Sequence, residues 1–307
     1  MTTRTLESPP RILPLYARAA APMIPGASLL PFVPGGKEIP DLELRLAGVV
    51  AEPGEVAAYA KVCGFPLRDS LPPTYPHVLA FPLHMAVMAD GGFPFGAVGL
   101  VHIENRIVQH RRIGIGEALD LAVRPAALQP HPKGRTFSLV TEARVGEELV
   151  WSSESTMLRR GKGDESARQV PDFESLPADA PASAEWKLTG DLGRRYGAVS
   201  GDRNPIHMHS LTAKPLGFPG AIAHGMWTKA RALAALDSRL SDGFEVDVRF
   251  RKPILLPGRV EFGSRDGNGG EIEFAVRDAK RHTPHLEGLL APLESTQKDT
   301  TKRKKAQ

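Results

Sequence analysis

Apolar and polar positions alternate along much of the chain and predict its strands. Residues 42–52 alternate like a half-buried strand, and residues 53–64 begin with a proline and carry apolar positions at helical spacing. Another helix is expected within 73–95, ending at Gly91-Gly92. Segments with strand-like alternation follow at 99–107, 117–128, 136–146 and 147–161. A helix followed by an antiparallel meander that can wrap it predicts an α+β unit.

The same order of elements returns in the second half of the chain. A short strand and helix are expected in 185–200, a long helix in 220–240, and further strands in 244–263 and 270–279. In the long helix, apolar residues keep the 3–4 spacing of a buried stripe at Met226, Ala230, Leu233 and Leu240. Two similar units in one chain are therefore expected.

The segments between and beyond these units differ in composition. Residues 161–184 are polar and rich in Asp, Ser, Ala and Pro, which is typical of a linker. The expected organisation is an extension at 1–35, a first unit at 36–160, the linker, a second unit at 185–295 and a basic tail at 296–307.

Charge and cysteine content exclude several classes of protein. The chain has 39 basic and 35 acidic residues; without the five basic residues and one acid of 298–307, 34 of each remain, so the body is neutral. The overall positive charge therefore says little about a nucleic-acid surface on the fold. The single cysteine, Cys63, cannot form an intramolecular disulfide. No apolar run is long enough to span a membrane, and a soluble cytoplasmic protein is expected.

The stretch SGDRNPIH, residues 200–207, carries the candidate chemistry. Asp202 precedes His207 by five positions, and Pro205 between them favours a stiff turn over a helix. Such a turn can place a carboxylate and an imidazole around one water molecule. Ser200 and Asn204 can hold the turn by side-chain hydrogen bonds.

Downstream, GFPGAIAHGM supplies a second candidate element. Gly217, Pro219 and Gly220 mark a turn, and a helix is expected to begin near them. The start of a helix offers unpaired backbone N–H groups, and Gly225 has no side chain to block a ligand. An N–H there could stabilise an enolate-like oxygen. Addition or removal of water beside a carbonyl fits this set, and hydrolysis fits it also.

Residues 196–227, YGAVSGDRNPIHMHSLTAKPLGFPGAIAHGMW, resemble the signature of the MaoC-like dehydratases, the family of (R)-specific enoyl-CoA hydratases. The similarity covers the tyrosine, SGD, NPIH, the GF turn and HGM. It implies a double hot-dog fold, in which each of two units wraps an antiparallel sheet around a long helix. The segment HGMWTKARAL, residues 224–233, is most similar to mycobacterial-type (3R)-hydroxyacyl-thioester dehydratases.

The resemblance implies a hydro-lyase that hydrates trans-2-enoyl thioesters to (3R)-hydroxyacyl thioesters by reversible syn addition. Asp202 and His207 would be the catalytic pair, Ser200 and Asn204 would support the loop, and the Gly225 amide would receive the thioester oxygen. Some members carry Ser where this chain has Ala230, which bears on how the thioester is positioned. The first unit lacks the motif and could act as the missing partner unit, leaving room for a longer acyl chain.

Other residues could serve a ligand but have simpler interpretations. His209 beside His207 could suggest a metal, but no further ligand cluster supports one, and no metal is expected. His224 is interpreted as structural at the start of the helix, and Trp227 as core or tunnel wall. Three basic residues that flank a strand are interpreted as solvated charges at its edge, and a contact with phosphates of CoA or of the phosphopantetheine of an acyl carrier protein is the alternative: Arg249, Arg251 and Lys252. No motif calls for ATP, NAD, a flavin or any other cofactor.

Two rival functions stay open: a hot-dog acyl-thioesterase and a non-catalytic acyl-thioester-binding protein. The expected partner is an acyl-CoA or an acyl carrier protein thioester, with no nucleic acid and no membrane, and the protein is expected to be a monomer or a homodimer. The sequence leaves open the acyl length, the carrier, the direction of reaction, and which of Asp202 and His207 moves which proton.

Overall fold

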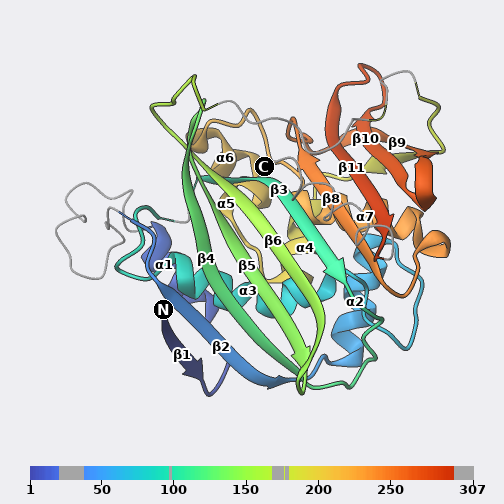
Figure 1. Ribbon diagram of the computed structural model, residues 1–307. Helices are drawn as coiled ribbons and strands as arrows, with labels where there is room; N and C mark the ends of the chain where they lie inside the picture. The colour runs from blue at the N-terminus through green and yellow to red at the C-terminus, as the bar shows by residue number, and fades with distance from the viewer. Residues whose placement is uncertain (21–37, 97–98, 168–175, 177–179, 294–307) are drawn as a thin grey trace. The chain divides into compact units, whose positions relative to one another are not determined.

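Figure 1 shows the computed structural model, which describes residues 1–20, 38–96, 99–167, 176 and 180–293. The chain forms two compact units, each assembled from segments distant in sequence. Unit 1 comprises Met1–Ala51, Pro76–Ile103 and Gly116–Val170, and unit 2 comprises Glu52–Tyr75, Glu104–Ile115 and Pro171–Gln307. Unit 2 therefore takes two segments from the N-terminal half of the chain.

The boundaries expected from the sequence stay predictions. Parts of the expected extension and linker, and all of the basic tail, lie outside the described residues. Within the described residues, no helix is both long and apolar enough to cross a membrane.

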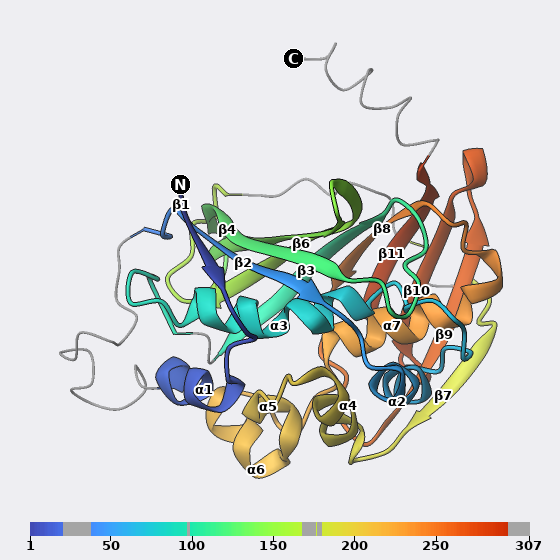
Figure 2. The same cartoon turned by 90° about the horizontal axis from the view of Figure 1, so that it is seen from below.

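Unit 1 is built on a curved sheet with strand order β1-β2-β4-β5-β6. The strands are β1 (Thr2–Leu6), β2 (Leu42–Val49), β4 (Leu119–His131), β5 (Gly134–Val145) and β6 (Glu148–Arg160). β1 pairs parallel to β2, and the other neighbours pair antiparallel. Helix α3 (Tyr75–Met88) runs across one face of this sheet, as Figure 2 shows, and α1 (Ile12–Ala20) lies outside it.

Unit 2 repeats this plan with an antiparallel sheet of order β3-β8-β11-β10-β9-β7. Its strands are β3 (Leu100–Gln109, whose residues from Glu104 on belong to this unit), β8 (Phe244–Phe250), β11 (Pro284–Pro292), β10 (Ile272–Asp278), β9 (Gly258–Asp266) and β7 (Ala184–Leu188). Its helices are α2 (Pro53–Cys63), α4 (Leu192–Ser200), α5 (Pro205–Met208), α6 (Ser210–Ala213) and α7 (Gly225–Ala235). α7 packs on β10 and β11, and α2 packs on α4 and α7 (Figure 2).

Most of the expected elements are confirmed, and the α+β class with them. The strand at 42–52, the helix at 53–64, the helix within 73–95 and the strands that follow appear as β2, α2, α3 and β3 to β6. Each unit sets a helix against a sheet whose strands pair antiparallel, apart from the parallel pair of β1 and β2 in unit 1, as the hot-dog expectation requires. β1, α1 and β11 were not expected from the sequence.

The expected long helix at 220–240 is wrong at both ends. α7 begins only at Gly225, because the residues before it are extended: Ile222 forms a bridge with Leu255, and Ala223 N–H donates to Ile254 O at 2.9 Å. The helix ends at Ala235 and is followed by a 3₁₀ turn at Asp237–Arg239. Leu240 therefore lies beyond the helix, whereas Met226, Ala230 and Leu233 are buried on it as expected.

Candidate active site

The loop between α4 and α5 holds Asp202. α4 ends at Gly201, whose φ of 75° lies in the left-handed region that glycine tolerates. Ser200 Oγ accepts a hydrogen bond from Asp202 N–H at 3.2 Å, and Asn204 N–H donates to Asp202 Oδ1 at 3.1 Å. Asn204 Oδ1 in turn accepts from Ile206 N–H at 3.4 Å and caps α5. The polar residues of SGDRNPIH therefore fix the direction of the Asp202 carboxylate.

His207 lies on α5, a single helical turn, and not on the irregular turn that the sequence predicted. Pro205 does not prevent this helix because it occupies the first helical position, where no N–H is required. The His207 ring is buried, with 8% of the residue exposed. Its Nδ1–H donates to Ile222 O at 2.8 Å, which leaves the lone pair of neutral His207 on Nε2.

His224 lies beside Asp202 and His207, although the sequence indicated only a structural role for it. It immediately precedes α7, but its side chain makes no capping hydrogen bond. Its Nε2–H donates to the main-chain oxygen of Asp202 at 2.9 Å and lies 3.8 Å from Asp202 Oδ2. Its ring stacks on His207 with 3.6 Å between ring centroids. The adjacency of His224 to Gly225 in the signature was the available signal.

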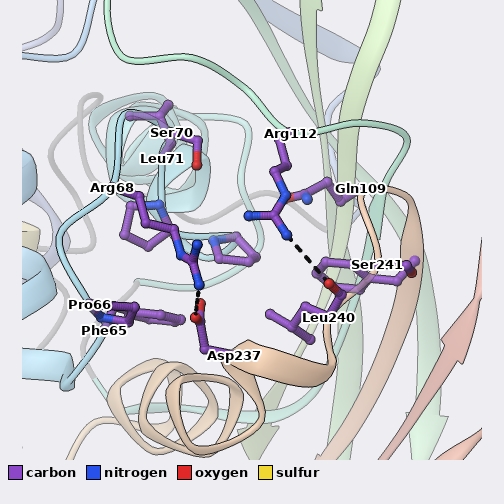
Figure 3. A pocket seen from close by; sticks show the side chains of 13 residues that line it. Phe65, Pro66, Arg68, Ser70, Leu71, Gln109, Arg112, Asp237, Leu240 and Ser241 are labelled. Atoms are coloured by element: carbon purple, nitrogen blue, oxygen red, sulfur yellow. Dashed lines mark hydrogen bonds and ion pairs between the residues drawn. The ribbon is translucent and has the colours of Figure 1, made fainter.

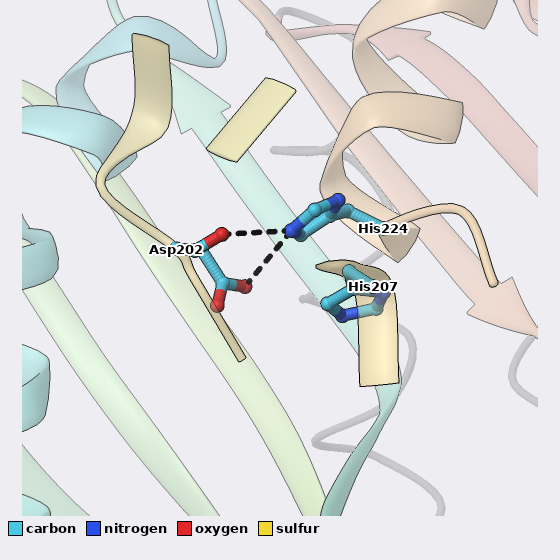
Figure 4. Close-up of side chains that lie close together, drawn as sticks. All are labelled: Asp202, His207 and His224. Carbon is cyan, nitrogen blue, oxygen red and sulfur yellow. Dashed lines mark hydrogen bonds and ion pairs between the residues drawn. The ribbon is translucent and has the colours of Figure 1, made fainter. Parts of the chain in front are cut away.

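Asp202, His207 and His224 converge, as Figure 4 shows. One ligand atom from each lies within 4.8 Å of the others. A water molecule that makes two hydrogen bonds of ordinary length bridges atoms about 4.6 Å apart. The Asp202 side chain is 30% exposed whereas His224 is 2% exposed, so solvent reaches the cluster from the Asp202 side.

Burial keeps both imidazoles of this cluster neutral near pH 7. Desolvation lowers the pKa of His207, although Asp202 and the hydrogen bond to Ile222 oppose the shift. Burial and the neighbouring His207 lower the pKa of His224 to about 3. A neutral His207 with its lone pair on Nε2 can accept a proton, and the carboxylate beside it can orient or accept one as well.

Two glycines of α4 allow the loop to pack against the helix. A Cβ on Gly193 would lie 2.0 Å from His207 O, and a Cβ on Gly197 would lie 2.8 Å from Asp202 O. Both positions belong to the helix that precedes the motif, one turn apart. Any side chain at Gly193 would push the backbone of His207 away. These positions were missed, and their spacing on α4 was the signal.

Gly225 is the first residue of α7 and follows His224 directly. The first backbone bond of the helix runs from Thr228 N–H to His224 O, so the N–H groups of the first turn have no partner within the helix. A Cβ on Gly225 would lie 3.1 to 3.2 Å from ring carbons of Phe250. A glycine therefore lets the start of the helix approach β8 closely.

Helix α2 supports this cluster from a part of the chain that precedes the motif. Tyr196 packs on His224 with ring centroids 4.8 Å apart, and Tyr59 of α2 packs on Tyr196 at 6.0 Å. Trp227 Nε1–H donates to Val62 O at 3.1 Å, and the Trp227 side chain is buried, which agrees with a core role. The N-terminal half of the chain thus contributes directly to the unit that holds Asp202 and His207.

The expected phosphate-contact residues lie at the end of β8. Arg249 is only 7% exposed, whereas Arg251 and Lys252 are exposed. Arg251 Nε pairs with Glu287 Oε2 at 2.5 Å. A contact with phosphate remains a prediction for these residues.

Among the described residues, those that lie close enough together to bind a metal ion are the same three of the cluster, and His209 is not among them. His209 is exposed, and its Nδ1 accepts from Leu211 N–H at 3.2 Å as the cap of α6. Asp202, His207 and His224 could geometrically hold a metal ion. In each histidine, however, one ring nitrogen already donates to a main-chain oxygen, and His224 Nε2 would have to give up that bond to turn towards Asp202. The expectation of no metal stays a prediction.

A separate pocket lies beyond the C-terminal end of α7 (Figure 3). Arg68 pairs with Asp237 there, and Arg112 donates to Leu240 O at 3.5 Å and to Asp242 Oδ1 at 2.6 Å. Because carboxylates already pair both guanidinium groups, the pocket has no net attraction for an anion. It contains none of the candidate site residues, and the length of α7, about 16 Å, separates it from Gly225.

Known proteins share both the sequence and the fold. Residues 172–279 match the MaoC like domain family. The chain is 37% identical over 267 residues to 3-hydroxyacyl-thioester dehydratase X of Mycobacterium tuberculosis, and the match covers 87% of this chain and 95% of that protein. The chain belongs to the MaoC-like dehydratase family.

Solved structures of MaoC-like dehydratases agree with this assignment. The crystal structure of HtdX from M. tuberculosis matches with a TM-score of 0.73 and 35% identity, over 82% of this chain and all of that one. A MaoC-like dehydratase from Phytophthora capsici matches with a TM-score of 0.68 over 81% of this chain and 94% of its own; at 22% identity it shows the fold alone. The hot-dog expectation is thereby confirmed.

Proposed function

We propose that this MaoC-like protein catalyses the reversible syn hydration of trans-2-enoyl thioesters to (3R)-hydroxyacyl thioesters. The observation that carries the proposal is the meeting of a fixed carboxylate, Asp202, with a neutral imidazole, His207, whose Nε2 is free to bind water. The relative named 3-hydroxyacyl-thioester dehydratase X supports the same reaction class.

The proposed reaction adds the elements of water across the C2=C3 bond. The water oxygen bonds to C3 as one of its protons passes to the Asp202–His207 pair, and the pair returns one proton to C2 on the same face. Charge that develops on the thioester oxygen is stabilised by the N–H of Gly225, which costs no reorganisation because the helix start is already in place. Elimination is the same path reversed, and no redox change occurs.

The supporting residues, the phosphate contacts and the compartment are each proposed on a different observation. Ser200 and Asn204 are proposed to hold the loop, on the strength of their hydrogen bonds to Asp202. Exposed Arg251 and Lys252, with Arg249 behind them, are the proposed contacts for phosphates of CoA or of a carrier-protein arm. The cytoplasm is the proposed compartment, because a single buried thiol at Cys63 suits reducing conditions.

The test uses purified full-length protein with trans-2-enoyl-CoA of short, medium and long chain, and the same acyl groups on a carrier protein. Loss of enoyl absorbance with formation of (3R)-hydroxyacyl product is expected, unaffected by a chelator. A free-thiol reagent is included throughout. Release of thiol without hydroxyacyl product would identify a thioesterase, and binding without either product would identify a binding protein. Activity on long chains would support a role for unit 1 in accepting them.

A further inference from the structure

Lys229 is a charged side chain in the middle of the core of unit 2. It is the fifth residue of α7 and has 0% exposure. Its Nζ donates to Asn105 O at 2.9 Å, to Asn105 Oδ1 at 2.6 Å and to Val246 O at 3.1 Å. An ammonium has three N–H donors and these oxygens are three acceptors, so the charged form is fully satisfied. A neutral amine would turn its lone pair towards one of the oxygens.

The neighbouring acids oppose the effect of burial on Lys229 only in part. Desolvation lowers its pKa well below the usual value, whereas Asp247 and Glu245 on β8 favour the charged form. Arg106 on β3 pairs with Glu245 at 2.6 Å, and burial raises the pKa of Asp247 to about 7. An apolar side chain would fill the same position without the desolvation penalty of a buried charge. A buried lysine at this position therefore points to a role beyond filling the core.

Its place in the fold suggests that use. Lys229 lies one helical turn after Gly225, about 6 Å further along the axis of α7. Its acceptors belong to β3 and β8, so the three bonds tie the first turns of α7 to both strands. At Gly225 the helix lies so close to β8 that a Cβ would be 3.1 to 3.2 Å from the Phe250 ring. The clamp at Lys229 and this contact together set how far the helix start stands from the sheet.

We propose that Lys229 is a positioning residue for the thioester carbonyl, whose ammonium clamps α7 to β3 and β8 and keeps the Gly225 N–H aimed at the carbonyl oxygen. This inference rests on the proposed hydratase function. The buried ammonium also lies near the positive end of the α7 dipole, and charges act more strongly on one another inside a protein than in water. Lys229 does not touch the substrate; it acts through Gly225.

Polarisation of the carbonyl can be measured without turnover. The absorbance band of an enoyl thioester moves to longer wavelength when its carbonyl oxygen is hydrogen-bonded, so the band of bound trans-2-enoyl-CoA in an Asp202→Asn background reports the Gly225 contact. We compare Lys229→Met, which keeps length and loses all three donors, with Lys187→Met, a matched change at an exposed lysine of β7. Steady-state kcat and KM are measured for each change in the wild-type background.

We expect Lys229→Met to reduce the band shift by at least half and kcat by at least tenfold, with KM within threefold of wild type, while Lys187→Met changes none of these. Asn105→Ala, which removes only the acceptor at 2.6 Å, covers the case in which Lys229→Met does not fold; it should change the shift and kcat in the same direction by a smaller factor.

Two results would overturn the inference. One is a full band shift in a folded Lys229→Met or Asn105→Ala protein. The other is a lower thermal stability of Lys229→Met with a kcat within twofold of that of Lys187→Met, which would mean that Lys229 stabilises the fold and has no part in catalysis. A wild-type protein that does not hydrate the enoyl thioester at all would instead contradict the proposed function, so the two failures are distinguishable.

Discussion

Each unit contains a group of histidines around a buried ring, and the group in unit 2 lies beside the carboxylate of Asp202. In unit 1, His77 lies 4.8 Å from His84 and 6.3 Å from His102 between ring centroids, and His84 Nε2 shares a hydrogen bond with Thr141 Oγ1 at 2.8 Å. In unit 2, His207 and His224 stack beside Asp202. The chemistry of the two groups differs although the residue types overlap.

The difference lies in what acts on each ring. Burial lowers the pKa of His84 far below its usual value, and the other two histidines lower it further. Asp202 opposes the same effect of burial at His207 and keeps a partly exposed carboxylate at its side. A carboxylate that solvent can reach, next to a buried neutral imidazole, is the arrangement in which we propose that water is held and deprotonated.

Of the changes that distinguish the two groups, substitution of His207 should have the largest effect on kcat. His207→Ala removes the free Nε2 and should lower kcat about 10³-fold, because general acid–base groups commonly contribute that much. The measurement is loss of enoyl absorbance under saturating substrate. His209→Ala, at the exposed neighbour, is the control and should stay close to wild type. Similar losses in both variants would mean that the motif serves only to fold the loop.

A glycine of α4 tests whether the loop position matters as much as its residues. Gly193→Ala places a Cβ 2.0 Å from His207 O, so the loop must move. A displacement of about 1 Å at a reacting group can cost about 10²-fold in rate, which is the loss we expect in kcat. Gly54→Ala on α2 meets nothing within 4 Å and provides the matched control. Unchanged kcat in folded Gly193→Ala would contradict the tight packing.

His224 gives a smaller effect. His224→Phe keeps an aromatic ring against His207 and Tyr196 but loses the donor to Asp202 O. One hydrogen bond contributes about 1 kcal/mol, so we expect kcat to fall about fivefold. A loss as large as that of His207→Ala would show instead that His224 handles a proton itself.

The unit 1 group should affect stability and not rate. Three histidines have lowered pKa values in the folded protein: His84, His207 and His224. Below about pH 6.5 the unfolded chain therefore binds protons that the folded chain does not, and the free energy of unfolding decreases as the pH is lowered. Each contributes up to about 1.4 kcal/mol per pH unit. His84→Gln removes one contribution: between pH 7.5 and 5.5 its urea midpoint should fall less than that of wild type, with kcat within twofold. An equal fall would contradict the neutral His84.

The sequence predicted what is decided locally. Asp202, Asn204 and Pro205 lie within one turn, and their hydrogen bonds reach only two residues along the chain. The start of α7 was placed too early because Ile222 and Ala223 are held extended by partners near residue 255, which no local pattern reveals.

The missed site residues share that cause. His224 matters through the main-chain oxygen of Asp202, 22 positions away, and Lys229 through Asn105, 124 positions away. The contribution of α2 to unit 2 is likewise a contact between distant segments. Local chemistry could therefore be predicted from the sequence, whereas the supports of the site required the fold.

The most direct measurement compares wild type with Asp202→Asn in hydration of a trans-2-enoyl thioester. Asparagine keeps the shape and can still accept from Asn204 N–H, so folding should persist and is checked by circular dichroism. The account predicts (3R)-hydroxyacyl product from wild type and a rate at least about 10²-fold lower from Asp202→Asn. Undiminished hydration by Asp202→Asn would contradict the claim that the carboxylate turns a buried histidine group into an active site.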